Sequence, residues 1–527
     1  MSSAQAEPRS KPGPRAAFRA KNPATGETLE GDFFESTVGE IDAAARAADR
    51  AFEPYAALPP ARRAEFLRAI AQQTMALGDR LLGRAAAETA FAPTRLENER
   101  ARTVGQTLLF AELIEEGSWV GARVDRALAD RKPKPRPDIR RMLVPVGPVA
   151  IFGASNFPLA FSVAGGDTIS ALAAGCPVVV KAHPAHPGTS ELSASAIRTA
   201  ARETGMPEGV FSMVQGPSPE VGITLVTHPL IRSAAFTGSL TAGRTLYDAA
   251  ALRPEPIPVF AEMGSSNPVF LLPGALEERG EAIAKGFAAS VTLGSGQFCT
   301  NPGLVVMVDT PVSNAFLKAA GDLLAGAAAG TMVHAGIKAA YDQGVAEVTR
   351  IAGVEVAARA QGPGANPETE AHAALLLTDA RTFLENPRLS EEIYGPASIA
   401  VRCASRLEMT QLARALHGHL TATVHGTEKD LSDCSELVAV LRRKVGRIVF
   451  NGFPTGVEVC HAMHHGGPYP ATTDARETSV GSAAIHRFAR PVCYQDFPQS
   501  ALPEELQNEN PRGIWRLVDG GFTKDAV

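Results

Sequence analysis

Between Thr37 and about Ser118, apolar residues recur at three- and four-residue intervals with charged residues between them. This spacing places the apolar side chains on one face of a helix. It predicts alanine-rich helices that are interrupted near Pro59–Pro60 and near Pro93, because proline lacks the backbone N–H that a helix interior uses.

From Lys132 onward, short strand-like runs replace the long helices. Residues 132–137 are a linker rich in proline and charge, and residues 140–152 are typical of strands. From there to about Phe260, apolar runs alternate with helical stretches, which indicates a parallel sheet with crossover helices. The alternation resumes after Glu262 and continues to about Gly446. The pattern therefore predicts an α/β protein of more than one unit.

The composition narrows the class of protein. A chain of 527 residues is too long for one ordinary core. A net charge of −5 gives no reason to expect nucleic acid or an anionic membrane as partner, and no apolar run approaches the ~18 residues of a spanning helix. Six cysteines without paired spacing suit a reducing compartment. We therefore expect a cytoplasmic protein.

Residues 1–20 contain serine, proline and arginine with a single acid, Glu7. Such a composition fits a transit peptide or a disordered leader. Prolines at positions 8, 12 and 14 interrupt any amphipathic helix, so the disordered leader is the favoured interpretation.

One segment carries a cysteine in an accessible setting. Gly294–Thr300 reads GSGQFCT, so small residues near Cys299 let the backbone approach a ligand closely. Cysteine attacks as the thiolate, which needs local N–H dipoles or positive charge to form. Glu262 could serve as a general base for water. By itself Cys299 fits a buried apolar cysteine better than a catalytic one, because most free cysteines are of that kind. A catalytic interpretation therefore depends on other segments.

Three upstream segments add possible binding chemistry. Val144–Pro158 is a strand-like run that contains Asn156, whose side-chain amide could donate to an oxyanion or merely cap a turn. Gly175–Pro184 is an apolar strand with Lys181 near its end. Ala234–Arg244 combines a strand, a glycine turn and a helix start, which is a weak phosphate-binding signal.

In this order and spacing, the segments resemble the aldehyde dehydrogenase superfamily over about residues 18–500. Asn22–Glu27 and Glu391–Pro396 fit the same pattern. A narrower resemblance is to the 2,5-dioxopentanoate (α-ketoglutarate semialdehyde) dehydrogenases, a branch also similar to a bacterial luminescence-associated fatty aldehyde dehydrogenase. It is carried by Lys181–Pro187, Phe450–Met463, Gly466–Thr472 and Arg490–Asp496.

The resemblance implies an α/β fold with a Rossmann-like cofactor domain, an α/β catalytic domain and a small β element that joins subunits into a homodimer or a dimer of dimers. After the leader, the expected divisions are a cofactor domain over 21–130 and 150–260, a catalytic domain over 261–447, and oligomerisation and C-terminal elements over 131–149 and 480–527.

The resemblance also implies catalytic roles. Cys299 would attack an aldehyde to give a thiohemiacetal, and its own N–H and the Asn156 amide would hold the oxyanion. Hydride loss to the cofactor would leave a thioester, and Glu262 would activate the water that hydrolyses it. The presence of this base favours hydrolysis over transfer of the acyl group to coenzyme A.

For the cofactor, Lys181 matches a residue that bonds the adenosine ribose. NAD-preferring relatives carry a glutamate three positions later, where this chain has Pro184. Without a carboxylate to repel a 2′-phosphate, we expect NADP, or both NADP and NAD, as cofactor. The residues expected to bind it are Lys181, His183, Pro184, Gly238, Ser239, Glu392 and Tyr394.

For the substrate, Ser155 stands where many relatives carry tryptophan, so a wider and more polar tunnel is expected. The substrate candidates are Ser155, Phe157, Thr300, Phe453, Thr455 and His461. His461 and His464 are three residues apart and could share a helix face as metal ligands. No metal is expected, because no cysteine or carboxylate is expected to complete such a site and the family uses none.

The function implied by the branch is oxidation of 2,5-dioxopentanoate, a small aldehyde, to 2-oxoglutarate. Two alternatives remain open at this point. One is a medium- or long-chain aliphatic aldehyde dehydrogenase on the same scaffold, and the other is a non-catalytic relative kept as a structural or binding protein.

Overall fold

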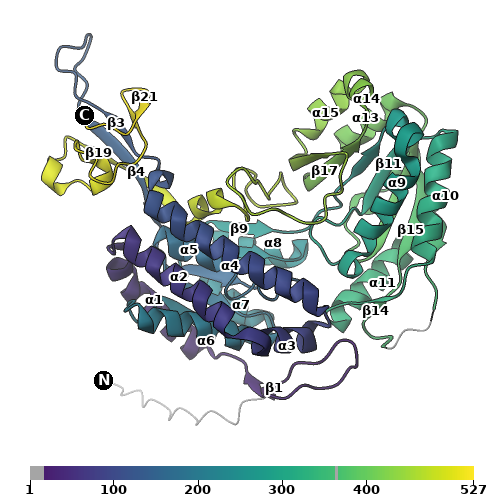
Figure 1. Cartoon of the computed structure of the whole chain (residues 1–527), viewed down its shortest axis with the longest axis horizontal. Coiled ribbons are helices and arrows are strands. Elements are labelled where there is room, and N and C mark those ends of the chain that lie inside the picture. Colours follow the sequence, from purple (N-terminus) through teal and green to yellow (C-terminus); the bar gives the residue numbers. More distant parts are fainter. Residues whose placement is uncertain (1–16, 363–365) are drawn as a thin grey trace, which may run out of the picture.

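The computed structural model describes residues 17–362 and 366–527, which form two large α/β units and a small projecting sheet (Figure 1). Most of the leader expected over residues 1–20 lies outside the described residues. Of its described end, Ala17–Phe18 form strand β1, which pairs antiparallel with β2 (Phe33–Phe34).

The apolar spacing predicted helices ahead of the first large sheet. In the described part of the chain these are α1 (Val38–Ala56), α2 (Pro60–Ala76), α3 (Gly78–Thr89) and α4 (Pro93–Glu116). Thr37 caps α1 in a capping box with Glu40. Pro60 and Pro93 are the first residues of α2 and α4, where a missing N–H costs nothing. The helix interruptions predicted near these prolines are confirmed.

The first sheet has five parallel strands in the order β7-β6-β5-β8-β9. The order reverses between β5 and β8, and ligands of such sheets bind outside the carboxyl ends at this point. Its strands are β5 (Val149–Phe152), β6 (Val178–Lys181), β7 (Phe211–Val214), β8 (Ser233–Thr237) and β9 (Val259–Glu262), and its helices are α5 (Gly166–Ala174), α6 (Pro187–Glu203), α7 (Pro219–Thr227) and α8 (Leu240–Ala251).

The second sheet has seven strands in the order β13-β15-β16-β11-β10-β17-β18, of which only β13 is antiparallel to its neighbour. It continues past Gly446 to Phe450 because β18 still pairs with β17. The strands are β10 (Val269–Leu271), β11 (Leu304–Val308), β13 (Glu355–Arg359), β15 (Ala374–Asp379), β16 (Ala397–Cys403), β17 (His419–His425) and β18 (Val445–Phe450).

Helices on both faces of this second sheet bury its apolar strands (Figure 1). They are α9 (Pro273–Thr292), α10 (Pro311–Ala325), α11 (Ala335–Thr349), α12 (Ala380–Glu385), α13 (Arg406–Ala415), α14 (Glu428–Asp433) and α15 (Ser435–Leu441). A separate two-stranded pair is formed by β12 (Gly330–Thr331) and β14 (Glu370–Ala371).

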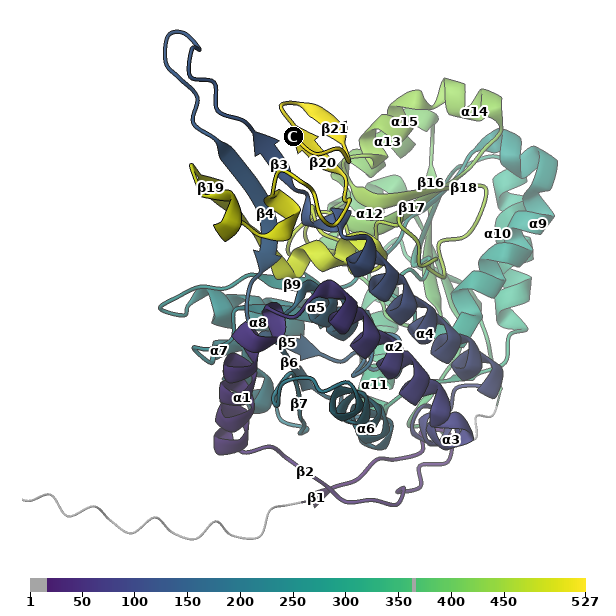
Figure 2. The same cartoon turned by 60° about the vertical axis from the view of Figure 1, so that its left-hand side comes forward.

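The small sheet has the strand order β19-β4-β3-β20-β21 and combines residues from two distant parts of the chain. It begins earlier than the expected boundary at 131, because Arg123–Asp125 pair with β4. Between β3 and β4 the chain projects far from the body (Figure 2). The strands are β3 (Arg123–Asp125), β4 (Ile139–Pro145), β19 (Ala489–Gln495), β20 (Arg516–Val518) and β21 (Gly521–Thr523).

Among the described residues, every helix is too short or too polar to cross a membrane.

Candidate active site

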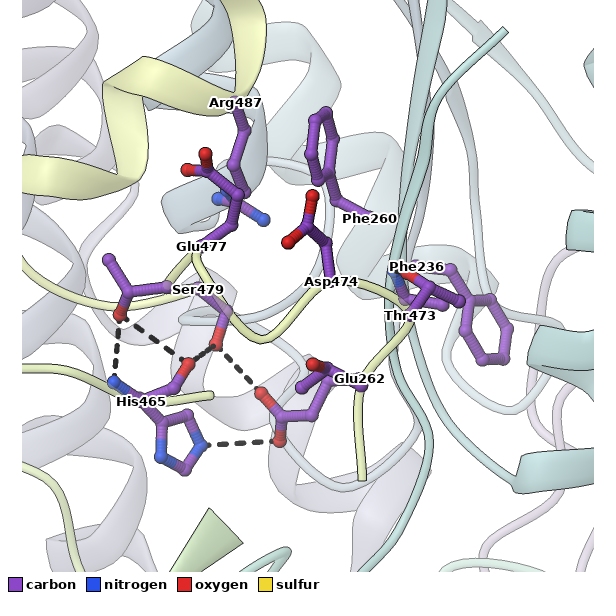
Figure 3. A pocket seen from close by; sticks show the side chains of 12 residues that line it. Phe236, Phe260, Glu262, His465, Thr473, Asp474, Glu477, Ser479 and Arg487 are labelled. Atoms are coloured by element: carbon purple, nitrogen blue, oxygen red, sulfur yellow. Dashed lines mark hydrogen bonds and ion pairs between the residues drawn. The ribbon is translucent and has the colours of Figure 1, made fainter. Parts of the chain in front are cut away.

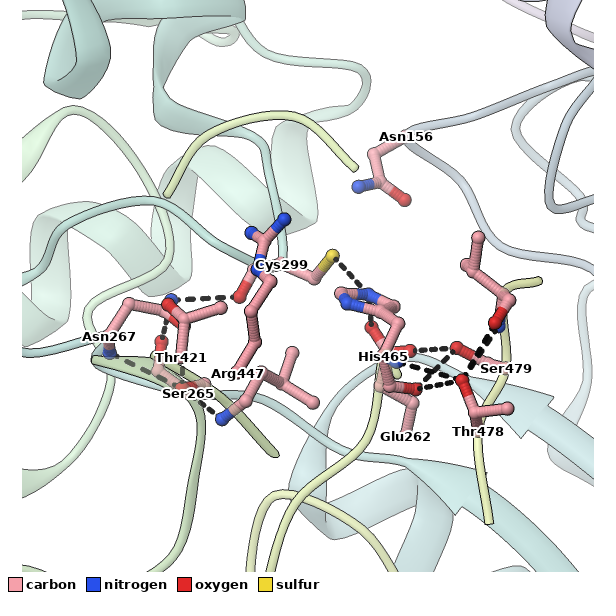
Figure 4. Close-up of polar contacts among 12 residues, drawn as sticks. Asn156, Glu262, Ser265, Asn267, Cys299, Thr421, Arg447, His465, Thr478 and Ser479 are labelled. Atoms are coloured by element: carbon pink, nitrogen blue, oxygen red, sulfur yellow. Dashed lines mark hydrogen bonds and ion pairs between the residues drawn. The ribbon is translucent and has the colours of Figure 1, made fainter. Parts of the chain in front are cut away.

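The carboxyl ends of the first sheet face the amino ends of the second, and the predicted catalytic residues meet there. Asn156 follows β5, and Glu262 is the last residue of β9. Cys299 lies in the loop between α9 and β11, ahead of the second sheet's central strands. The two sheets thus bring together three side chains from three separate segments (Figure 4).

The loop that presents Cys299 has an unusual backbone. Gly294, Ser295 and Gly296 all have positive φ angles, of 55°, 58° and 66°. A Cβ at Gly296 would lie 2.2 Å from the carbonyl carbon of Gly395, so only glycine permits this close approach. The Asn267 side chain donates to the Cys299 carbonyl oxygen at 2.9 Å. These contacts fix the position of the thiol.

His465 lies between the sulfur and the carboxylate. Its Nε2 is 3.3 Å from Cys299 Sγ and 3.2 Å from Glu262 Oε1. Ser479 donates to the other carboxylate oxygen of Glu262 at 2.7 Å, as Figure 3 shows. The segment that carries His465 and Ser479 runs along the free edge of β9, where Met263 N–H donates to the Ala471 carbonyl.

The burial of this cluster perturbs its ionisation. Burial opposes the negative charge of Glu262, yet the electrostatic interaction and hydrogen bond with His465, together with the hydrogen bond from Ser479, outweigh this effect and hold the pKa of the carboxyl below its usual range. Burial, together with the Glu262 carboxylate, raises the pKa of the Cys299 thiol well above its ordinary value. The resting sulfur is therefore protonated at neutral pH and needs a base before it can attack.

Asn156 is buried beside this cluster. Its Nδ2 donates to the Gln297 carbonyl at 3.1 Å, which engages one of the two hydrogens of the amide. Its backbone carbonyl accepts from Arg95 Nη2 at 2.7 Å.

The histidine segment differs from the sequence prediction. Residues 459–466 are not helical, so His461 and His464 share no helix face. Instead, His465 joins Cys299 and Glu262, with the ligand atoms of all three within 4.8 Å of one another. The sequence analysis did not anticipate that a cysteine and a carboxylate lie beside His465. Such a trio has donors suited to a borderline-soft cation such as Zn²⁺, which would block the sulfur.

The residues predicted near the adenosine end of the cofactor surround the carboxyl end of β6. Burial lowers the pKa of Lys181 to about 8, and the Glu35 carboxylate acts against that change. The His183 ring lies 5.5 Å from His186 and 6.1 Å from His334, and burial lowers its pKa well below the usual value. Pro184 follows, half-buried.

At the carboxyl end of β8 the backbone is open to a phosphate. Gly238 and Ser239 are exposed, and Ser239 caps α8 by accepting from Ala242 N–H at 3.3 Å. Thr237 Oγ1 is buried there without a hydrogen-bond partner among the described residues. A helix N-terminus with an unsatisfied hydroxyl beside it fits a pyrophosphate group.

Glu392 and Tyr394, the remaining two predicted cofactor residues, lie in the second unit, and the Glu392 carboxylate reaches Gly264, just after β9 of the first unit. Burial raises the pKa of Glu392 to about 8, and the charge of Glu262 adds to this rise. A Cβ at Gly264 would lie 2.5 Å from the Glu392 carboxylate, so only glycine allows that approach. Burial raises the pKa of Tyr394 well above its ordinary value, and the Asn156 side chain acts against this rise.

The substrate candidates fall into two groups. Phe157 lies near Cys299, because its ring packs edge-on against Phe298 at 5.5 Å; Ser155 is half-buried and Thr300 is buried in the same two loops. The other three candidates contact different elements. The Phe453 ring packs against Phe287 and His425. Thr455 is hydrogen-bonded to Ser290 of α9, and His461 is hydrogen-bonded to Ser482.

The sequence analysis named the neighbouring His461 and His464 but gave no role to His465, and it overlooked Ser479. Both contacts with Glu262 span more than 200 residues of chain, and no local spacing signals such a contact. The single available hint was the pair of histidines directly before Gly466–Gly467.

Comparison with known proteins gives the following matches. The Aldehyde dehydrogenase family model matches residues 10–489. Alpha-ketoglutaric semialdehyde dehydrogenase 2 of Azospirillum brasilense is 51% identical over 510 residues, which cover 96% of this chain and 97% of that protein. Alpha-ketoglutaric semialdehyde dehydrogenase of Acinetobacter baylyi is 47% identical over 494 residues, covering 94% and 93%. Among solved structures, a betaine aldehyde dehydrogenase variant from Staphylococcus aureus in complex with NAD⁺ superposes with a TM-score of 0.77 at 20% identity, covering 93% of this chain and 96% of that one.

Proposed function

Because this chain belongs to the aldehyde dehydrogenase family, we propose that it oxidises 2,5-dioxopentanoate to 2-oxoglutarate with a nicotinamide cofactor. The names of the two relatives at 51% and 47% identity support the substrate. The meeting of Cys299, Glu262 and Asn156 around one space is the observation that carries the chemistry.

The reaction begins with loss of the thiol proton of Cys299. His465 Nε2 lies 3.3 Å from the sulfur and is placed to accept this proton in the state in which it does not donate a hydrogen to Glu262. The thiolate then bonds to the aldehyde carbon while the carbonyl electron pair moves to oxygen. Asn156 Nδ2 and the Cys299 N–H stabilise that oxyanion.

The cofactor is expected to be held by Lys181 and Pro184 at the adenosine end, by Gly238 and Ser239 at the pyrophosphate, and by Glu392. When bound, the nicotinamide supplies an acceptor for the hydride that leaves the thiohemiacetal carbon, so that Cys299 carries a thioester. Lack of a carboxylate at position 184 favours acceptance of NADP alongside NAD.

Hydrolysis completes the reaction. Glu262 is held ionised by His465 and Ser479, so it can take a proton from a water molecule that attacks the thioester. The carbon–sulfur bond breaks, the acid leaves, and the sulfur regains its proton.

For the assembly, we propose that the small sheet joins two subunits into a homodimer or a dimer of dimers. Two large aromatic side chains near its outer strands support this proposal, since Trp515 is 50% and Phe522 is 76% exposed. All six cysteines are free thiols, in keeping with the proposed cytoplasmic location.

The proposal is tested by incubating the purified protein with 2,5-dioxopentanoate and either NAD⁺ or NADP⁺, without coenzyme A. The expected result is one 2-oxoglutarate for each reduced cofactor. Turnover of long-chain aliphatic aldehydes without turnover of 2,5-dioxopentanoate would instead support an aliphatic aldehyde dehydrogenase, and no turnover of any aldehyde would support a non-catalytic protein.

A further inference from the structure

One face of α4 carries three ionisable residues toward the active site. Arg95, Glu99 and Arg102 are spaced four and three residues apart, so they lie along the same side of the helix. Glu99 is buried, and its Oε1 accepts from the N–H groups of Leu159 and Ala160 at 2.8 and 2.9 Å. This face therefore packs against the loop that begins at Asn156.

Positive charge exceeds negative charge on this face. Two guanidinium groups accompany a single carboxyl group, and burial raises the pKa of that Glu99 carboxyl. Arg95 uses Nη2 to bond the Asn156 carbonyl. Arg102 has no hydrogen bond or ion pair with any described residue, and its Nε and Nη2 are both buried. The carboxylates of Glu99, Glu262 and Glu458 act on its charge only from a distance.

The Arg102 guanidinium packs on aromatic rings next to the loop that carries Cys299. The guanidinium carbon is 5.1 Å from the centre of the Phe161 ring and 5.8 Å from that of Phe157. The Phe157 ring packs against Phe298, the residue before Cys299. The charge of Arg102 also opposes the rise that burial and Glu262 impose on the pKa of the Cys299 thiol.

We propose that Arg102 binds the carboxylate of the substrate at the end opposite the aldehyde, and so selects short aldehydes that bear an acid group. The proposal rests on the proposed function and adds the residue that recognises the anion. The Nε and Nη2 groups of Arg102 lie side by side without a partner, and such a pair of donors can bind the two oxygens of a carboxylate. A buried cation without a partner is costly, and the bound substrate would remove that cost.

The acid group of the proposed substrate lies a short distance from its aldehyde group. Four carbon–carbon bonds separate the aldehyde carbon of 2,5-dioxopentanoate from its carboxylate carbon, a span of ~5 Å when extended. The rings of Phe157 and Phe161 contact the Arg102 guanidinium, and they hold it in a fixed place by cation–π attraction.

Arg95 and Arg447 are the rivals among nearby cations. Arg95 also has Nε and Nη1 buried without a partner, but its Nη2 is engaged by the Asn156 carbonyl, so it lacks a free side-by-side pair of donors. Arg447 too is in electrostatic contact with Cys299. Its Nη1 and Nη2 already donate to the carbonyls of Gly456 and Pro454, at 3.1 and 2.6 Å. Only its Nε is buried without a partner. Arg447 therefore holds the 454–456 loop, whereas Arg102 has a free pair of donors.

The test compares native protein with Arg102→Gln, Arg102→Lys and Arg447→Gln. Arg100→Gln is the matched control, because Arg100 lies on the same helix but bonds the Gly78 carbonyl. The value of kcat/KM is measured for 2,5-dioxopentanoate and for pentanal, which has the same length but no charge. Arg102→Gln should lower the ratio of kcat/KM for the acid to kcat/KM for pentanal at least about tenfold. Arg102→Lys should lose less, and Arg100→Gln should leave the ratio between the two aldehydes unchanged.

A second readout does not depend on which aldehyde is the natural substrate. Glutarate, a five-carbon diacid, should inhibit pentanal oxidation competitively, and Arg102→Gln should raise its inhibition constant at least about tenfold. An equal loss with both aldehydes, an unchanged inhibition constant, or a selective loss in Arg447→Gln alone would overturn the role of Arg102. If native protein shows no preference for 2,5-dioxopentanoate but Arg102 still controls glutarate inhibition, the proposed substrate is wrong and the anion site stands.

Discussion

The imidazole Nε2 of His465 lies 3.3 Å from the sulfur of Cys299, and the same nitrogen lies 3.2 Å from a carboxylate oxygen of Glu262. One ring nitrogen carries at most one proton. It cannot donate to the carboxylate and accept from the thiol at the same time. Proton transfer from Cys299 to His465 therefore depends on whether His465 is donating a hydrogen bond to Glu262, the residue that later activates water.

Replacement of Cys299 or Glu262 should separate the two halves of the reaction. Cys299→Ala should abolish oxidation while cofactor binding is retained, because no thioester can form. Glu262→Gln should release one reduced cofactor per site in a burst and then turn over slowly, because the acyl-enzyme accumulates. Stopped-flow absorbance measures the burst. A Glu262→Gln protein with a near-native steady-state rate would remove Glu262 from the role of base.

His465→Asn should slow formation of the thiolate. We expect the rate of Cys299 alkylation by iodoacetamide and the burst rate to fall by about tenfold or more at neutral pH, because proton transfer from the thiol loses its acceptor. His486→Asn is the matched control, since that side chain is exposed. Equal alkylation rates in native and His465→Asn protein would show that another group takes the proton.

The pH dependence of alkylation should reveal the carboxylate beside the sulfur. Burial and the negative charge of Glu262 raise the pKa of the Cys299 thiol, so alkylation should keep increasing with pH beyond the ~8.5 typical of free cysteine. Removing the charge in Glu262→Gln favours the thiolate, and the midpoint should move to lower pH. A midpoint that stays in place or moves upward would contradict this electrostatic account.

The sequence predicted the features that depend on local interactions. Thr37 with Glu40 starts a helix, and Pro60 and Pro93 are accepted in first turns, because caps and proline act within one turn. His465 reaches Cys299 across 166 residues, and only the packing of a loop against the edge of β9 places it there. In the sequence, Arg102 resembles any charged residue on the exposed face of an amphipathic helix. Its burial becomes evident only in the fold, where Phe157 and Phe161 pack against it.

Cofactor choice should follow position 184. Native protein should use NADP at least as well as NAD, and Pro184→Glu should raise selectivity for NAD about tenfold or more, or ~1.4 kcal/mol, by repelling the 2′-phosphate. Steady-state kinetics with both cofactors measures this.

If native protein ignored NADP, the interpretation of Pro184 would be wrong. Glu35 acts on the charge of Lys181 and accepts a hydrogen bond from Ser218 N–H at 2.8 Å. In that case, the effect of replacing Glu35 on the preference between NAD and NADP should be measured next.

The most direct test of the account is the ratio of kcat/KM for 2,5-dioxopentanoate to that for pentanal, measured with one preparation of native protein. If one charge-assisted hydrogen bond recognises the acid group in the transition state, kcat/KM for 2,5-dioxopentanoate should exceed that for pentanal at least about tenfold. Equal efficiency, or a steady rise of kcat/KM with alkyl chain length, would contradict the proposed substrate and favour an aliphatic aldehyde dehydrogenase.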